Sequence, residues 1–236
     1  MLSFIKKGLT NNQLKIIAMA SMLVDHIGEM FYPFNPVFKI IGRLAFPIFA
    51  FMVAEGALHT KNRARYLAVI AGMGVIFQIV YFVFMKSLYM GILITFSLSI
   101  GAIYCIDALI NKNSVLIKVI ASLIMLAILF VSAVMPVLLE DKGFAVDYTV
   151  LGVALPVAVY YSKTKLTKLI STAIILVAIA LTAIDMVNGY VQFFLLLAIP
   201  LLALYNGKRG KYKLKYVFYI FYPLHLVVLY GIATFF

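Results

Sequence analysis

Ionisable side chains interrupt long apolar stretches at a few positions, and these residues are the ones that could carry chemistry. Asp25 and His26 lie in LKIIAMASMLVDHIGEM, Arg43 lies in FKIIGRLAFPIFAFMVAEG, and His225 lies in YVFYIFYPLHLVVLY. Histidine takes up and releases a proton near neutral pH, whereas an arginine cation stabilises negative charge. Because such groups are costly in apolar surroundings unless they have a partner or a task, each is a candidate functional residue.

The composition indicates that these surroundings are a membrane. Of the 236 residues, 65% are hydrophobic and 12% are charged, with a mean hydropathy of +1.10. A soluble domain carries about 25% charged residues. Long apolar runs without period-2 alternation favour helices over a transmembrane barrel. We therefore predict an all-α fold, a polytopic membrane helix bundle that forms one integral membrane domain over residues 1–236.

The bundle is expected to have about nine transmembrane helices. A span needs roughly 20 mostly apolar residues. Segments of this kind lie at about 14–32, 37–58, 64–85, 88–110, 115–139, 146–161, 166–186, 190–205 and 216–235. The sixth and the eighth are short for a membrane span.

The basic residues predict how the spans are oriented. The net charge is +12, and the lysines and arginines concentrate in the N-terminal segment and in loops 59–65, 111–118, 162–168 and 206–215. Cytoplasmic loops carry the Lys/Arg excess, so these loops and the N-terminus are expected inside and the C-terminus outside. The location is then the bacterial cytoplasmic (inner) membrane. Charge scattered between apolar runs in this way does not indicate nucleic-acid binding.

The predicted orientation also gives a depth for each polar residue. At a rise of about 1.5 Å per residue, five side chains from five spans fall in one layer below the outer surface. They are His26 and Arg43 at about 9 Å, Gln78 at about 10 Å, Ser97 at about 13 Å and His225 at about 15 Å. An enclosed polar site requires such a layer.

Simpler roles are open for some of these residues. Gln78 and Ser97 are of types that often join helices to one another. Asp25 and Arg43 could form a structural salt bridge, and Glu55 with His59 could form a local pair. Cys105 is the only cysteine, so neither a disulfide within the chain nor a cysteine metal cluster is expected. No metal motif, nucleotide-binding loop or nucleophile elbow is present.

Four segments together resemble the TraX family, which is named for a conjugation protein implicated in N-terminal acetylation of pilin. They are LKIIAMASMLVDHIGEM, GRLAFPIFAFMVAEGALHTKNRARYL, LYNGKRG and YVFYIFYPLHL. More distantly, a first helix that bears histidine looks like the OafA-type and heparan-glucosaminide acetyltransferases. The resemblance implies acetyl-CoA as donor and a membrane histidine as catalyst. The acceptor stays open between a pilin-like protein and a cell-surface glycan or other small molecule.

Acyl transfer needs a base for the acceptor proton and positive charge where the oxyanion develops. His26 is the first choice for the base, with Asp25 or, better, a carboxylate or amide of the second or third span as its orienter. Arg43 could stabilise the oxyanion or clamp an anionic substrate. His225 is the alternative base, or holds the thioester carbonyl.

The phosphates of a cytoplasmic CoA need cations from the inner loops. Candidates are Lys61, Arg63, Arg65, Lys208 and Arg209, although each could equally be a topology signal. Two other functions compete with the enzyme. A small transporter or permease would also explain charges within the membrane. A non-catalytic pilus-assembly protein would need no membrane histidine.

Overall fold

A computed structural model describes residues 8–186, 188–211 and 214–234, and nearly all its regular structure is helical, which confirms the all-α class. The chain divides into two compact units. The first comprises Met1–Met52 and Lys163–Phe236, and the second comprises Val53–Ser162. One integral membrane domain over residues 1–236 stays a prediction.

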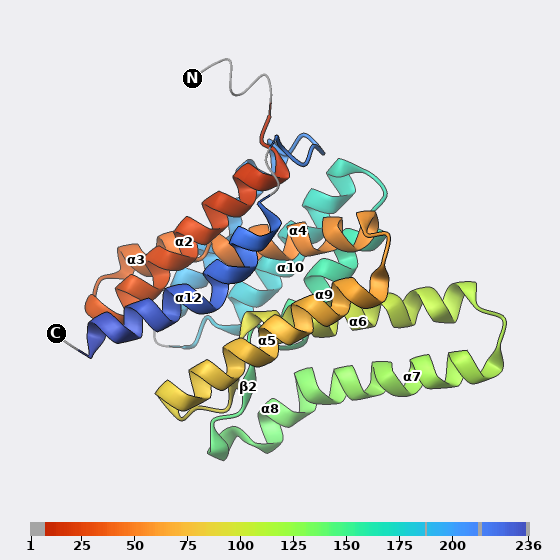
Figure 1. Ribbon diagram of the computed structural model, residues 1–236, viewed down its shortest axis with the longest axis horizontal. Coiled ribbons are helices and arrows are strands. Elements are labelled where there is room, and N and C mark those ends of the chain that lie inside the picture. Colours follow the sequence, from red (N-terminus) through yellow and green to blue (C-terminus); the bar gives the residue numbers. More distant parts are fainter. Residues whose placement is uncertain (1–7, 187, 212–213, 235–236) are drawn as a thin grey trace. The chain divides into compact units, whose positions relative to one another are not determined.

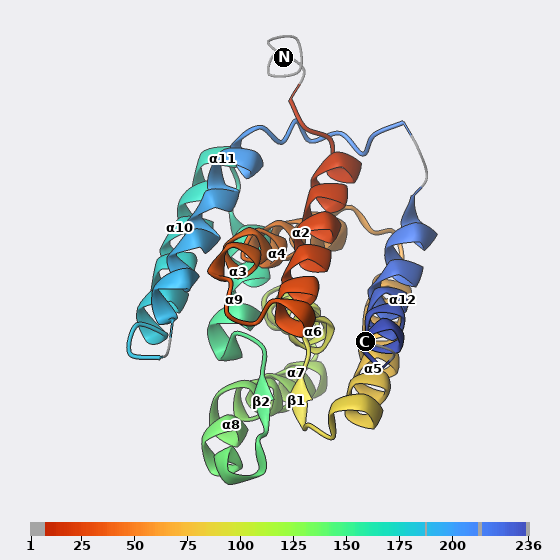
Figure 2. The ribbon, with the colours of Figure 1, turned by 90° about the vertical axis from the view of Figure 1, so that its left-hand side faces the viewer.

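The first unit is built around α2. Its elements are α2 (Asn11–Phe31), α3 (Pro36–Gly42), the first half of α4 (Ala45–His59), α10 (Lys165–Thr182), η3 (Gly189–Leu197), α11 (Ala198–Ala203) and α12 (Lys215–Ala233). Helices α3 and α12 both pack on α2, and the three can be followed in Figure 1. In Figure 2, α10 runs beside α11. The segment η3, which precedes α11 in the chain, also packs on α10. Leucines at 14, 176, 195, 202 and 226 are fully buried in this unit.

The second predicted span is broken, and its sequence explains where. Helix α3 begins at Pro36, with the Asn35 side chain as its N-cap, and ends at Gly42. The proline ring at position 47 clashes with a helical carbonyl four residues earlier, which is that of Arg43. Two turn residues therefore separate α3 from α4.

The second unit is built around α6. Its elements are the rest of α4, α5 (Arg63–Met85), β1 (Tyr89–Met90), α6 (Ile92–Asn111), α7 (Val115–Leu129), η1 (Phe130–Val134), α8 (Met135–Leu138), η2 (Glu140–Lys142), β2 (Ala145–Val146) and α9 (Thr149–Tyr161). Helices α5, α7 and α9 each pack on α6. The strands β1 and β2 pair in parallel, a small feature that the apolar pattern does not predict (Figure 2).

Each predicted span corresponds to a helical segment, but the segments differ in length and hydropathy, the two properties that a membrane span requires. Over the described residues, five are long and apolar enough: Pro36–His59, Arg63–Met85, Ile92–Asn111, Val115–Leu138 and Lys165–Thr182. Thr149–Tyr161, Gly189–Ala203 and Ile220–Ala233 are shorter apolar helices. Helix α2 carries three charged residues, Lys15, Asp25 and Glu29. A count of nine transmembrane helices stays a prediction.

Candidate functional site

The two membrane histidines meet in the first unit. His26 comes from α2 and His225 from α12, and their ring centroids lie 5.0 Å apart with the planes at 65°. Because α12 packs along α2 (Figure 1), side chains almost two hundred positions apart in the chain become neighbours. The structure thus brings together two histidines that the sequence placed on separate spans, while their depth in a membrane stays a prediction.

Local hydrogen bonds determine which nitrogen of each ring is available. The Nδ1 atom of His26 lies 2.9 Å from the carbonyl oxygen of Met22, and that of His225 lies 2.9 Å from the carbonyl oxygen of Phe221. A carbonyl oxygen only accepts, so in each neutral ring Nδ1 carries the hydrogen and donates it. Both Nε2 atoms then keep a lone pair, which is the arrangement a general base needs.

The surroundings of the two rings differ. His225 is 5% exposed, and its Nε2 atom is buried without a hydrogen-bond partner in the described part of the chain. Its ring stacks on Phe221 at 4.9 Å and meets the edge of Tyr222 at 6.1 Å. His26 is only partly buried. The pair thus combines one enclosed nitrogen base with one that a substrate can approach.

Acidic side chains on α2 face a lysine on α3. Lys39 Nζ lies 3.9 Å from Asp25 Oδ1 and 3.7 Å from Glu29 Oε2. Gly42 allows this approach, because a Cβ at its position would overlap the Asp25 side chain. Sequence reasoning did not single out Lys39. The i, i+4 spacing of Asp25 and Glu29, followed by a lysine on the next helix, is the signal for it.

Arg43 lies at the break between α3 and α4, where its backbone N–H bonds the Lys39 carbonyl oxygen at 3.0 Å. Its guanidinium interacts electrostatically with the Asp25 carboxylate, as Lys39 does. Lys39 is a partner of Asp25 that the sequence did not suggest, in addition to the suggested pairing of Asp25 with Arg43. The Nδ1 atom of His26 is held by the Met22 carbonyl and not by the carboxylate or amide that the sequence suggested.

The two uncharged residues of the predicted layer belong to the second unit. Gln78 donates to the carbonyl oxygen of Tyr89 at 2.9 Å and accepts from the N–H of Gly91 at 3.2 Å. Ser97 donates to the Leu93 carbonyl oxygen of its own helix at 2.7 Å. Gln78 therefore joins α5 to the β1 segment, which is the structural role that was the simpler alternative.

One of the predicted CoA-binding cations has an acidic partner. Arg63 Nη2 lies 2.6 Å from Asp107 Oδ2 and 3.0 Å from the Tyr160 hydroxyl. Tyr160 and Tyr161 donate to the two Asp107 carboxylate oxygens at 2.9 and 2.8 Å. Asp107 was not predicted as part of any site. Lys61 and Arg65 are exposed beside this network.

The other two predicted cations lie on a shaped loop of the first unit. The carbonyl oxygens of Lys208 and Arg209 accept from the N–H groups of Asn11 and Asn12, at 2.8 and 3.2 Å. Gly210 has a φ of +100°, a conformation that glycine adopts readily. The backbone thus turns toward the start of α2 and leaves the Lys208 and Arg209 side chains exposed. Throughout the described ranges, no three His, Cys, Asp or Glu side chains gather as metal ligands would.

The apolar helices, five of them long enough to cross a membrane over the described residues, indicate a multi-pass α-helical membrane protein. Its family follows from comparison with known proteins: the model of the TraX protein family matches residues 10–233, so the chain belongs to the TraX family. A probable fimbrial assembly protein FimC, serogroup H1, of Dichelobacter nodosus is 25% identical over 92% of this chain and 93% of its own length.

A shorter match covers part of the chain. An uncharacterized protein, RP591, of Rickettsia prowazekii (strain Madrid E) is 39% identical over 72 residues, which are 30% of this chain and 27% of that protein. No solved structure matches the chain.

Proposed function

We propose that the protein is a membrane-embedded acetyltransferase that moves an acetyl group from cytoplasmic acetyl-CoA to an amine or hydroxyl of an acceptor at or across the bacterial cytoplasmic membrane. The observation that carries the proposal is the contact of His26 with His225, 5.0 Å between ring centroids, with both Nε2 atoms available as bases. A purely structural histidine in an apolar helix bundle would use its remaining nitrogen in a hydrogen bond.

The reaction assigns one task to each group. The acceptor nitrogen or oxygen attacks the thioester carbonyl carbon, and its proton passes to a histidine Nε2. The tetrahedral intermediate then collapses, the carbon–sulfur bond breaks, and the CoA thiolate takes the proton from the imidazolium. His26 is the better-placed base for an entering acceptor because it is partly exposed. Arg43, whose charge acts at the neighbouring Asp25, would stabilise the oxyanion.

The donor's phosphates would bind the exposed cations of the inner loops. Lys208 and Arg209 suit this role, because their loop is held by backbone hydrogen bonds and their side chains are exposed. Lys61 and Arg65 are equally exposed in the second unit. Arg63 is the weakest of the five candidates, since Asp107 already neutralises its charge.

The test is binding and transfer by the purified protein in lipid nanodiscs. Acetyl-CoA should raise the unfolding temperature, because a ligand that binds only the folded state stabilises it. Label from radioactive acetyl-CoA should appear on an acceptor in a membrane extract of the source cells. The Lys208→Ala/Arg209→Ala variant should need more acetyl-CoA for both effects. No stabilisation by acetyl-CoA or CoA at any concentration tested would refute the proposal.

A second candidate function is favoured by the FimC relative, whose name refers to fimbrial assembly. In that reading the protein assists assembly of a pilus-like fibre without catalysing a reaction. The two candidates predict different phenotypes for a strain that carries His26→Ala. If this variant abolishes acetyl transfer while fibres of normal number still assemble, the assembly role does not depend on the enzyme activity.

A further inference from the structure

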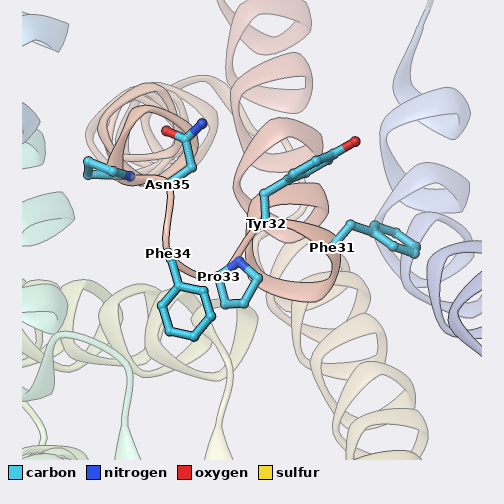
Figure 3. Close-up of a pocket in the computed structure, with 6 residues that line it drawn as sticks. Phe31, Tyr32, Pro33, Phe34 and Asn35 are labelled. Atoms are coloured by element: carbon cyan, nitrogen blue, oxygen red, sulfur yellow. The ribbon is translucent and has the colours of Figure 1, made fainter.

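The loop between α2 and α3 exposes an unusual amount of aromatic surface. Phe34 is 97% exposed and Tyr32 is 54% exposed. The loop residues Phe31–Pro36 line a cavity of about 460 Å³, within the size range of small-molecule sites. In Figure 3 the Phe31 and Phe34 rings point away from each other on either side of the loop. No Asp, Glu, Lys, Arg or His lies between Phe31 and Phe38.

This exposure is fixed by the loop's own bonds. The Asn35 N–H donates to the Tyr32 carbonyl oxygen at 3.0 Å, and the Val37 N–H donates to Asn35 Oδ1 at 3.1 Å. The Tyr32 ring stacks on Phe38 at 5.0 Å. Two prolines, at positions 33 and 36, restrict the backbone further. These contacts restrain the backbone on both sides of Phe34, whose side chain is exposed.

The apolar surface continues directly into a helix that can cross a membrane. Pro36 is the first residue of the candidate span Pro36–His59. The nearest charges, Glu29 and Lys39, are paired with each other behind the loop. A fully exposed phenylalanine is unfavourable in water and favourable among hydrocarbon chains. The bilayer that the neighbouring candidate span is apolar enough to cross is therefore the partner that fits this surface.

We propose that the Phe31–Pro36 loop inserts into the bilayer and that its cavity holds hydrocarbon chains of membrane lipids. Phe31 follows His26 by five residues, about 7.5 Å along α2. Lipid chains in this hollow therefore lie beside the helix that carries the histidine pair. The proposal concerns where the loop lies, and it holds whether or not the protein transfers acetyl groups.

The sequence supplies a clean probe, because it contains no tryptophan. The Phe34→Trp variant carries a single indole at a position so exposed that the fold is not expected to change. The full-length protein is reconstituted in vesicles of phosphatidylcholine whose acyl chains are brominated, and fluorescence quenching is measured. Leu123→Trp, at a 61% exposed position of candidate span Val115–Leu138, calibrates contact with lipid. Asn113→Trp, exposed in the loop after α6, calibrates contact with water.

The expected result is that bromines near the headgroup quench the Phe34→Trp variant about as strongly as any bromine quenches the Leu123→Trp variant, and that aqueous iodide quenches it little. Strong iodide quenching, like that of the Asn113→Trp variant, would overturn the proposal because the loop would then face water. Protection from both quenchers would overturn it as well, because protein, from this chain or a second copy, would then cover the loop.

Discussion

Among the residues that the structure describes, the buried Nε2 atom of His225 has no hydrogen-bond partner. A buried group of this kind costs about 1–3 kcal/mol of stability. The Nδ1–H bond to Phe221 and the stack on its ring hold the imidazole in place beside the His26 ring. A functional role explains the unsatisfied nitrogen better than packing does, because reduced stability is commonly tolerated at functional sites.

The first prediction uses this cost. His225→Phe keeps an aromatic ring of similar size and removes the unsatisfied nitrogen, so the unfolding temperature should stay equal or rise. If His225, the alternative base, takes the acceptor's proton instead of His26, acetyl transfer should fall by about 10²-fold or more, the loss expected for a general base. His59→Phe is the matched control: its Nδ1 atom has the same bond to the carbonyl four residues earlier, but the side chain is exposed.

Unfolding temperatures and initial transfer rates of the two variants show whether the role of His225 is structural or catalytic. A clear fall in the unfolding temperature of the His225→Phe variant would mean that the histidine is structural. A transfer rate near that of the unmodified protein would remove His225 from the mechanism and leave His26 as the base.

Three helices of the second unit are joined at one end by a compact polar network. Asp107 on α6 receives hydrogen bonds from Tyr160 and Tyr161 at the end of α9 and pairs with Arg63 at the start of α5. The carboxylate side chain is only 13% exposed. Arg63 also lies over the Tyr104 ring, 5.1 Å from its centroid. The network is a better account of Arg63 than donor binding.

The second prediction separates these two roles. Asp107→Ala removes the buried carboxylate that accepts from Tyr160 and Tyr161 and pairs with Arg63, so the free energy of unfolding should fall by about 1–3 kcal/mol. Arg63→Ala should lower it by less, because that side chain is half exposed. Lys61→Ala, two residues away and exposed, should leave it unchanged.

The apparent KM for acetyl-CoA completes this comparison. If Arg63 is structural, Arg63→Ala lowers the unfolding temperature and barely alters KM. A raised KM with an unchanged unfolding temperature would instead restore Arg63 to the donor site.

At the scale of single helices, the sequence predicts the features that depend on residues close to one another in the chain. The break near Arg43 follows from Pro47, and the start of α3 follows from Asn35 and Pro36. The meeting of His26 and His225 could be expected only as a shared depth. Asp107 escaped prediction because it lies near a span end, where a charge resembles a solvated one, and its partners come from distant helices. The β1–β2 pair depends on two loops that meet only in the folded chain.

The predicted orientation of the whole molecule in the membrane rests on the distribution of lysine and arginine among its loops. Five clusters of lysine and arginine alternate with loops that carry few cations. The rule for cytoplasmic loops then places the histidine pair nearer the outer surface and Lys208 and Arg209 inside. An acetyl group would thus enter from one side of the membrane and meet its acceptor near the other.

The third prediction tests this orientation. Cys105 is buried, so a single engineered cysteine can be labelled selectively in a Cys105→Ser background. Asn113→Cys should react with a membrane-impermeant maleimide only after the cells are opened. Asp141→Cys, exposed in the loop before β2, should react in intact spheroplasts. The opposite pattern would invert the molecule and with it the side from which the donor arrives.

The 3-10 winding of η3 allows a short segment to match a longer neighbour. Gly189–Ala203 has nine residues at about 2.0 Å and six at about 1.5 Å, and so reaches about 27 Å. Helix α10, against which it packs, has 18 residues and is about 27 Å long as well. The 3-10 winding thus lengthens the segment. The same residues in an α-helix would end about one turn short. The segment and α10 would then no longer extend equally far through a hydrocarbon layer about 30 Å thick.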